Sequence, residues 1–136
     1  MSTAELAAFQ GVSLSFIRKL LTDLEQGGIV KSHSGRNGGF SLASPKENIS
    51  VLDVVNVIEP RKRLFDCKEI RQRCALFNND VPAWVTSKPC EINAVFLNAE
   101  AAMFSELAKT TLENIDQAFS AKAPKSFSEQ AIKWFK

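Results

Sequence analysis

Apolar and polar positions at the start of the chain follow the period of two short helices separated by a glycine. Ser2, followed three residues later by Glu5, has the form of a capping box and predicts a short helix to about residue 9. Gly11 suits the left-handed conformation of a tight interhelical turn, and Ser13 predicts the cap of a second helix to about residue 26. The apolar residues of this second helix share one face: Leu14, Ile17, Leu20, Leu21 and Leu24.

Two strand-like runs come next, over residues 29–32 and 39–43. The polar, glycine-bearing segment between them favours a β-hairpin. Ser50 then predicts the cap of a helix with an apolar stripe, and Pro60 lies just beyond its end. Residues 60–88 show no period and predict a long irregular segment, which is uncommon in a small protein unless it is functional or disordered.

A long helix is predicted from Pro89 to about Lys109, followed by a short helix that starts at Thr111. The apolar residues of the long helix lie on more than one face: Ile92, Phe96 and Met103 on one, Leu97 and Phe104 elsewhere. Such a helix needs two covering surfaces, and in so short a chain we expect the second surface to come from another copy, as in a homodimer. The tail after residue 120 is amphipathic, and its pattern does not say whether it docks.

The first two helices have the pattern of a helix-turn-helix. A small residue at Ala7 allows close packing, Gly11 makes the turn, and Ile17 anchors the second helix in the core. The polar residues near the start of the second helix then face outward, where base edges of double-stranded DNA are read: Ser13, Ser15, Arg18, Lys19 and Thr22. The alternative is a plain helical hairpin with a solvated face, and the β-hairpin at the right distance favours the DNA-binding interpretation.

Composition narrows the class of protein without choosing the partner. The net charge of +2 is too small to indicate a nucleic-acid ligand, but residues 61–73 are basic and residues 91–116 acidic. There is no apolar run as long as a membrane span and no signal peptide, so we expect a cytoplasmic protein with no membrane partner. In that compartment the three cysteines are expected to be ligands or redox groups.

Four segments, residues 11–21, 24–32, 38–43 and 49–59, resemble the Rrf-two family of winged helix-turn-helix transcription regulators. That family includes the iron–sulfur cluster regulator, the nitric-oxide-sensing repressor and the cysteine-metabolism repressor. The resemblance implies a mainly α fold with a small β-hairpin wing and a long dimerisation helix. It places Ser13, Ser15, Phe16 and Arg18 at the recognition-helix positions that approach DNA, and the outward face of the helix adds Lys19. Family members often have an arginine where this chain has Ser34. Arg36, beside Asn37 at the wing tip, is the nearest arginine and is expected to serve the same electrostatic purpose; the alternative is a solvated hairpin-tip arginine.

The resemblance also implies an organisation of the chain. We expect a DNA-binding domain over residues 1–59, a cysteine-bearing sensor loop over 60–88, dimerisation helices over 89–120, and a C-terminal tail over 121–136. Family members begin with a further helix before the segment that matches Ser2, so the first family helix is expected to be missing here: either the start of the sequence is misassigned, the chain is trimmed, or this member has lost the helix. Its loss is expected to expose part of the core and weaken the dimer.

Cluster-bearing relatives place three cysteines in the region that holds Cys67, Cys74 and Cys90 here. The resemblance therefore implies these three as ligands of an iron–sulfur cluster, with the fourth ligand unknown. One branch of the family has a histidine where this chain has Asn93, a poor iron ligand, and His33 is expected to be a surface residue. A zinc ion would need a closed set of four ligands, and here too the fourth ligand is missing. The alternative is direct thiol chemistry, through oxidation of Cys67 or Cys74.

Together these patterns predict a homodimeric regulator on a pseudo-palindromic operator, with the cysteines reporting redox state, iron–sulfur status or nitric oxide. Two alternatives remain: a thiol-redox regulator without metal, and a truncated dimerisation module that does not bind DNA. An enzyme is not expected, because there is no C-x-x-C pair and a single histidine leaves no visible pairing of nucleophile and base.

Overall fold

The computed structural model describes residues 1–35, 38–60, 63–78 and 80–135. The chain forms two compact units, one of residues Met1–Pro60 with Leu107–Lys136 and the other of Arg61–Glu106. No helix in the described part of the chain is long and apolar enough to cross a membrane.

The first unit opens with the predicted pair of helices, α1 (Thr3–Gln10) and α2 (Leu14–Gln26). The capping box is present: the Ser2 amide donates to the Glu5 carboxylate at 2.8 Å, and the Glu5 amide donates to the Ser2 hydroxyl at 3.2 Å. Gly11 has φ 66°, a left-handed value that glycine adopts without steric strain and that strains most other residues. Ser13 caps α2. The helix-turn-helix prediction is confirmed.

The core of this unit lies where α1 crosses α2. Ala7, Ile17 and Leu21 are the most buried residues there, at 5%, 4% and 8% exposed, and Val30 and Phe40 of the hairpin pack against them. The same three residues hold both helices and the hairpin together, so the core fixes the orientation of α2 and leaves its opposite face exposed.

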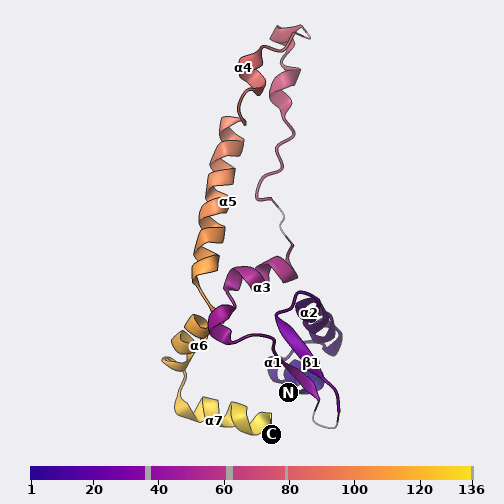
Figure 1. Ribbon diagram of the computed structural model, residues 1–136, viewed down its shortest axis with the longest axis vertical. Coiled ribbons are helices and arrows are strands. Elements are labelled where there is room, and N and C mark those ends of the chain that lie inside the picture. Colours follow the sequence, from indigo (N-terminus) through magenta and orange to yellow (C-terminus); the bar gives the residue numbers. More distant parts are fainter. Residues whose placement is uncertain (36–37, 61–62, 79, 136) are drawn as a thin grey trace. The chain divides into compact units, whose positions relative to one another are not determined.

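The hairpin consists of β1 (Val30–His33) and β2 (Gly39–Leu42), antiparallel, with Val30 opposite Leu42 and His33 opposite Gly39 (Figure 1). Each strand lies within one residue of its predicted bounds. The glycine pair that ends α2 differs from a simple cap: Gly27 keeps a helical φ of −79°, and Gly28 takes the left-handed φ of 73°. Ile29 then turns back into the core and is 9% exposed.

A short helical turn, η1 (Lys46–Asn48), leads to α3 (Val51–Ile58). Helix α6 (Leu112–Ser120) packs against η1. Ser50 and Thr111 form an isolated antiparallel bridge. The Val51 amide donates to the Thr110 carbonyl at 2.8 Å, and the Leu112 amide donates to the Ile49 carbonyl at 2.9 Å. Both helices therefore start from one small patch of strand-like pairing.

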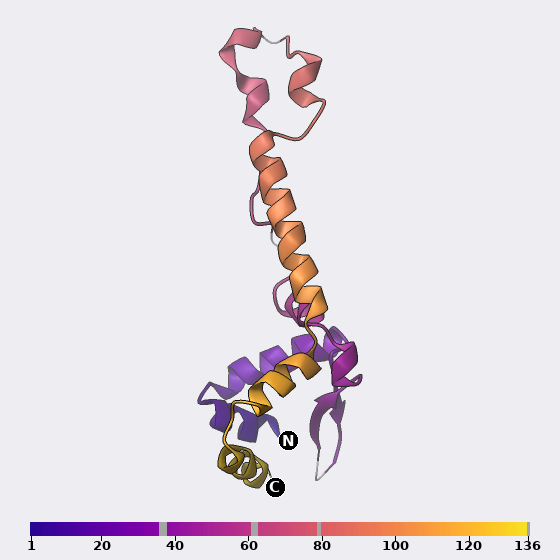
Figure 2. The same ribbon diagram turned by 90° about the vertical axis from the view of Figure 1, so that its left-hand side faces the viewer.

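The tail, left open by the sequence, forms α7 (Lys125–Trp134) and docks on α1. The Phe9 ring lies 6.0 Å from the Trp134 ring and 4.9 Å from the Phe135 ring, centroid to centroid. The Trp134 indole N–H donates to the Glu5 carbonyl at 3.3 Å. The two ends of the chain accordingly lie side by side in both views (Figures 1 and 2).

The second unit contains η2 (Ile70–Arg73), η3 (Ala75–Phe77), α4 (Ala83–Thr86) and most of α5 (Glu91–Lys109). The expectation of an irregular segment is therefore wrong in part, because single turns are too short to show a hydrophobic period. The expected start of the long helix at Pro89 is also wrong by two residues. The Cys90 carbonyl accepts the first helical bond, from Ala94 at 2.9 Å, so Cys90 stands in the capping position.

Candidate nucleic-acid interface and cysteine pocket

The residues predicted to approach DNA from α2 all lie on its exposed side. This set comprises Ser13, Ser15, Phe16, Arg18 and Lys19. Phe16 is 55% exposed although it is a large apolar residue, so the packing of the unit does not account for its position. The structure thus brings these residues together on one surface that the core does not use.

Ser13 and Ser15, at the start of α2, make different hydrogen bonds. The Ser13 hydroxyl accepts a hydrogen bond from the Phe16 amide at 3.2 Å, so its first role is to cap the helix. The Ser15 hydroxyl lies 3.2 Å from that of Ser13. Ser15 carries no capping bond and retains most of its capacity for an external partner.

The two basic residues of this surface also differ. Lys19 pairs with Asp23 one turn later, with Nζ 2.8 Å from Oδ2. Within the described part of the chain, the Arg18 guanidinium makes no hydrogen bond or ion pair. The Arg18 guanidinium is therefore available to an external partner without the loss of an existing contact, whereas Lys19 would have to share or release Asp23.

The wing residues Arg36 and Asn37 lie outside the described residues. The described part of the hairpin is tied to α2 by Glu25, whose carboxylate accepts from the Ser32 amide at 3.0 Å and also from the Ser32 hydroxyl. These bonds, first the hydroxyl and then the amide, hold the pKa of Glu25 below its usual value. Sequence reasoning missed this link, since an exposed glutamate near a helix end gives no signal of its partner.

His33 is exposed on β1, and its Nε2 lies 2.8 Å from the Ser41 hydroxyl on the neighbouring strand. This places it at the surface of the hairpin, as the sequence predicts.

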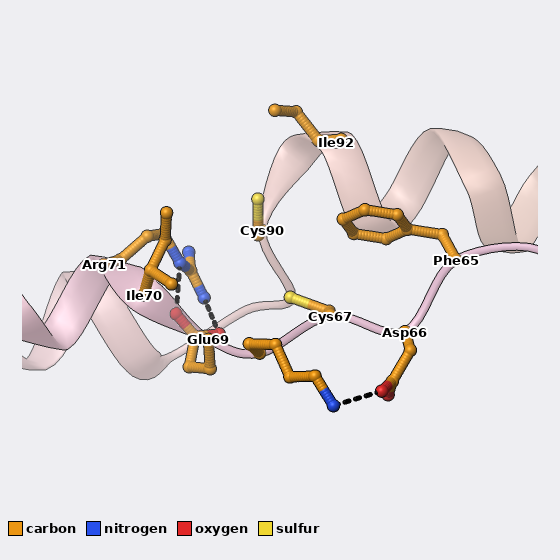
Figure 3. Close-up of a pocket in the computed structure, with 9 residues that line it drawn as sticks. Phe65, Asp66, Cys67, Glu69, Ile70, Arg71, Cys90 and Ile92 are labelled. Atoms are coloured by element: carbon orange, nitrogen blue, oxygen red, sulfur yellow. Dashed lines mark hydrogen bonds and ion pairs between the residues drawn. The ribbon is translucent and has the colours of Figure 1, made fainter.

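In the second unit, a cavity of about 270 Å³ brings two of the three cysteines together. Cys67, from the segment before η2, and Cys90, directly before α5, both line it (Figure 3). Phe65 and Ile92 give it apolar walls, and the Phe65 ring stacks on Phe96 of α5 at 4.8 Å. Both cysteines are half-buried.

Two basic residues, Lys68 and Arg71, line this pocket, and Arg71 is held there by several hydrogen bonds. Its Nε and Nη2 atoms donate to the two carboxylate oxygens of Glu69, each at 2.7 Å, and Nη2 also donates to the Lys88 carbonyl at 3.0 Å. The pKa of Arg71 is raised, chiefly by the bond to Glu69. Figure 3 shows this pair beside the two sulfur atoms.

The third predicted ligand lies elsewhere. Cys74 is exposed between η2 and η3 and does not line the pocket. Among the described residues, no three His, Cys, Asp or Glu side chains are grouped so that they could hold a metal ion. Asn93 keeps a buried side-chain oxygen without a hydrogen-bond partner, but it is not part of the pocket wall. The donor set as arranged does not fit a cluster held by three cysteines.

Large apolar residues remain uncovered on α5. Ile92 and Val95 are 60% and 67% exposed, and Met103 is 41% exposed. Several exposed large apolar residues on one helix are typical of an interaction surface.

A helix-turn-helix with a two-stranded wing, an open polar face on its second helix and a long following helix define a winged helix-turn-helix DNA-binding protein. The chain belongs to the Rrf2 family, whose model is described as an iron-dependent transcriptional regulator and matches residues 1–117. The fold class and the family predicted from the sequence are confirmed.

Individual relatives agree with this assignment. Protein aau3 of Rhizobium meliloti is 32% identical over 115 residues, which cover 84% of this chain and 68% of that protein. A relative in Mycobacterium tuberculosis is 42% identical over 59 residues, but this match covers only 37% of its length. Among solved structures, CymR of B. subtilis, described as a global cysteine regulator, has a TM-score of 0.64 at 22% identity over 87% of this chain and 78% of that chain. That likeness shows the fold.

Proposed function

We propose that this chain acts as a homodimer that binds a pseudo-palindromic operator through α2 and the wing. The observation that carries the proposal is the exposed polar face of α2, with Arg18 unpaired among the described residues, mounted on the packed core of Ala7, Ile17 and Leu21. In a helix-turn-helix this face enters the major groove. Ser13, Ser15, Phe16 and Lys19 complete the proposed contact surface, and Arg36 and Asn37 are proposed for the wing.

The dimer part of the proposal rests on α5. Its exposed Ile92, Val95 and Met103 are costly in water and are covered when a second copy packs against the helix. To bind a pseudo-palindrome, a twofold dimer has to present its two copies of α2 about 34 Å apart, one turn of the duplex.

The cysteine segment is proposed to report a signal to this dimer. Because Cys67 and Cys90 share a pocket and Cys74 does not, the arrangement supports thiol chemistry better than a three-cysteine iron–sulfur cluster. An anaerobic absorption spectrum after reconstitution with iron and sulfide distinguishes the two, because a cluster absorbs in the visible and thiols do not.

The operator is unknown, so the test begins with selection of bound duplexes from a random pool, followed by fluorescence anisotropy on the enriched sequence. We expect an enriched pseudo-palindrome and a Kd that weakens as salt rises. Arg18→Ala should weaken binding about ten-fold or more, since a good base contact contributes about 1–3 kcal/mol. Lys122→Ala removes one exposed charge away from α2 and should leave the Kd unchanged.

Two results contradict the proposal. Failure to enrich any sequence indicates a module that does not bind DNA specifically. An equal loss in Arg18→Ala and Lys122→Ala indicates that only the overall charge matters.

A further inference from the structure

The pocket in the second unit sorts the three cysteines into a pair and a single thiol. Cys67 and Cys90 line one cavity and are half-buried, whereas Cys74 is exposed and does not line it. The spacing along the chain favours the opposite pairing, because Cys67 lies much closer in sequence to Cys74 than to Cys90. The fold therefore groups Cys67 with Cys90, a pairing that the sequence spacing does not predict.

We propose that Cys67 and Cys90 are a redox-active dithiol that closes to an intramolecular disulfide on reaction with a peroxide, while Cys74 remains a free thiol. This inference concerns a modification site in the second unit and does not depend on DNA binding.

The surroundings of the pair favour the reaction. The Arg71 guanidinium belongs to the same cavity wall as the two cysteines, and the reactive form of a cysteine is the thiolate, which a nearby cation favours. Cys90 also stands at the start of α5, where the unbonded amides of the first helical turn face a negative charge. The pair therefore lies beside both a cation and the start of a helix.

The backbone allows the two sulfur atoms to meet. Cys90 is held at the start of α5, but residues 65–69 form neither helix nor strand. A disulfide requires the two Cα atoms to approach to about 4.4–6.8 Å. Movement of Cys67 toward Cys90 would therefore break no helix or strand, and both residues line the same cavity of about 270 Å³.

The chemistry balances with hydrogen peroxide as the oxidant. One thiolate attacks a peroxide oxygen, the O–O bond breaks, and the products are a sulfenic acid and hydroxide, which takes up a proton to become water. The second thiolate attacks the sulfenic sulfur, the S–O bond breaks, and the departing hydroxide becomes a second water. The two sulfur atoms together lose two electrons, and these reduce the peroxide.

The test uses the full chain, reduced and treated with a chelator, then exposed to one equivalent of hydrogen peroxide. Remaining thiols are alkylated with N-ethylmaleimide, and intact mass and peptide mapping locate the modification. We expect the number of alkylatable thiols to fall from three to one, the mass to drop by two hydrogens, and a Cys67–Cys90 peptide pair to appear. Dithiothreitol should restore three alkylatable thiols.

Matched serine variants make the outcome decisive. Cys74→Ser should still lose two hydrogens, whereas Cys67→Ser and Cys90→Ser should not form an intramolecular bond. The proposal is overturned if Cys74 appears in the linked peptide, if the bond joins two chains on a non-reducing gel, or if all three thiols remain alkylatable. It is also overturned if Cys67→Ser oxidises to a Cys74–Cys90 bond as fast as the native chain closes its own.

Discussion

Ser50 and Thr111 face each other in an antiparallel bridge, and each caps the helix that begins at the next residue. The Ser50 hydroxyl accepts from the Asp53 amide at 3.1 Å, and the Thr111 hydroxyl accepts from the Asn114 amide at 3.2 Å. Asp53 and Asn114 in turn accept from the capping amides, at 2.8 Å and 2.9 Å. Two capping boxes thus stand back to back across one bridge.

Removing either hydroxyl should destabilise the first unit. We expect Ser50→Ala and Thr111→Ala each to lower the free energy of unfolding by about 1 kcal/mol, because each leaves a helical amide without its acceptor. Urea denaturation followed by circular dichroism measures the change. Ser105→Ala, on an exposed position within α5, is the control and should not destabilise. Equal midpoints in all three variants would show that the caps contribute nothing.

Lys46 joins η1 to α6 by ion pairs with Glu113, at 2.8 Å, and with Asp116. The bond to Lys46 is the main reason that the pKa of Glu113 lies below the ordinary glutamate value of 4.5. The carboxylate therefore stabilises the fold at pH values above 4.5, and this contribution is lost as pH falls through its lowered pKa.

Lys46→Gln should accordingly lower the Tm at neutral pH, by a small amount because the pair is partly exposed. The difference in Tm between the native chain and the variant should shrink toward zero on acidification below the lowered pKa. Thermal melts across the acidic range measure this difference. A gap that stays constant with pH would assign the effect of the substitution to packing of the lysine stem.

The docking of α7 depends on Trp134. We expect Trp134→Ala to release the tail, since it removes the ring against Phe9 and the indole bond to Glu5. Limited trypsin digestion should then cut at Lys122 and Lys125 faster than in the native chain. Ile132→Ala, which truncates a 58% exposed residue of the same helix, is the control and should be cut at the native rate.

The link between α2 and the wing can be tested at one amide. Glu25→Ala should speed hydrogen exchange of the Ser32 amide, which loses its acceptor, and should change global stability little because Glu25 is exposed. Exchange followed by NMR measures it, with the Phe40 amide as an internal comparison. Unchanged protection of Ser32 would mean that strand pairing alone shields this amide.

Self-association should respond to a charge on α5. Val95→Glu is expected to shift sedimentation equilibrium toward the monomer, because the residue is 67% exposed and a buried unpaired carboxylate opposes association. Ser128→Glu adds the same charge on α7 and should leave the mass unchanged. If both variants keep the native mass, this face of α5 is not the dimer contact.

Local signals in the sequence predicted the elements of the first unit well. Ser2, Gly11, Ser13 and Ser50 each act within a few residues, so the helices and their starts follow from neighbouring chemistry. The bridge from Ser50 to Thr111 was not predictable in this way. It joins segments far apart in the chain, and a capping threonine gives no sign of which strand-like residue it meets.

The candidate functional residues show the same difference between local and long-range information. The exposed face of α2 follows from helical spacing, because the buried positions of the helix define its opposite side. The grouping of Cys67 with Cys90 depends on how an irregular segment folds beside α5, and sequence spacing carries no information about that. The docking of α7 on α1 could not be predicted from the sequence either, because an amphipathic pattern does not indicate which surface covers the apolar face.

The contact between Trp134 and Phe9 has a consequence for biosynthesis. Phe9 of α1 is synthesised well before Trp134 of α7, so its ring lacks this cover until α7 has left the ribosome. The first unit cannot complete this contact earlier, and a nascent chain stalled before α7 exposes the Phe9 ring to solvent and to chaperones.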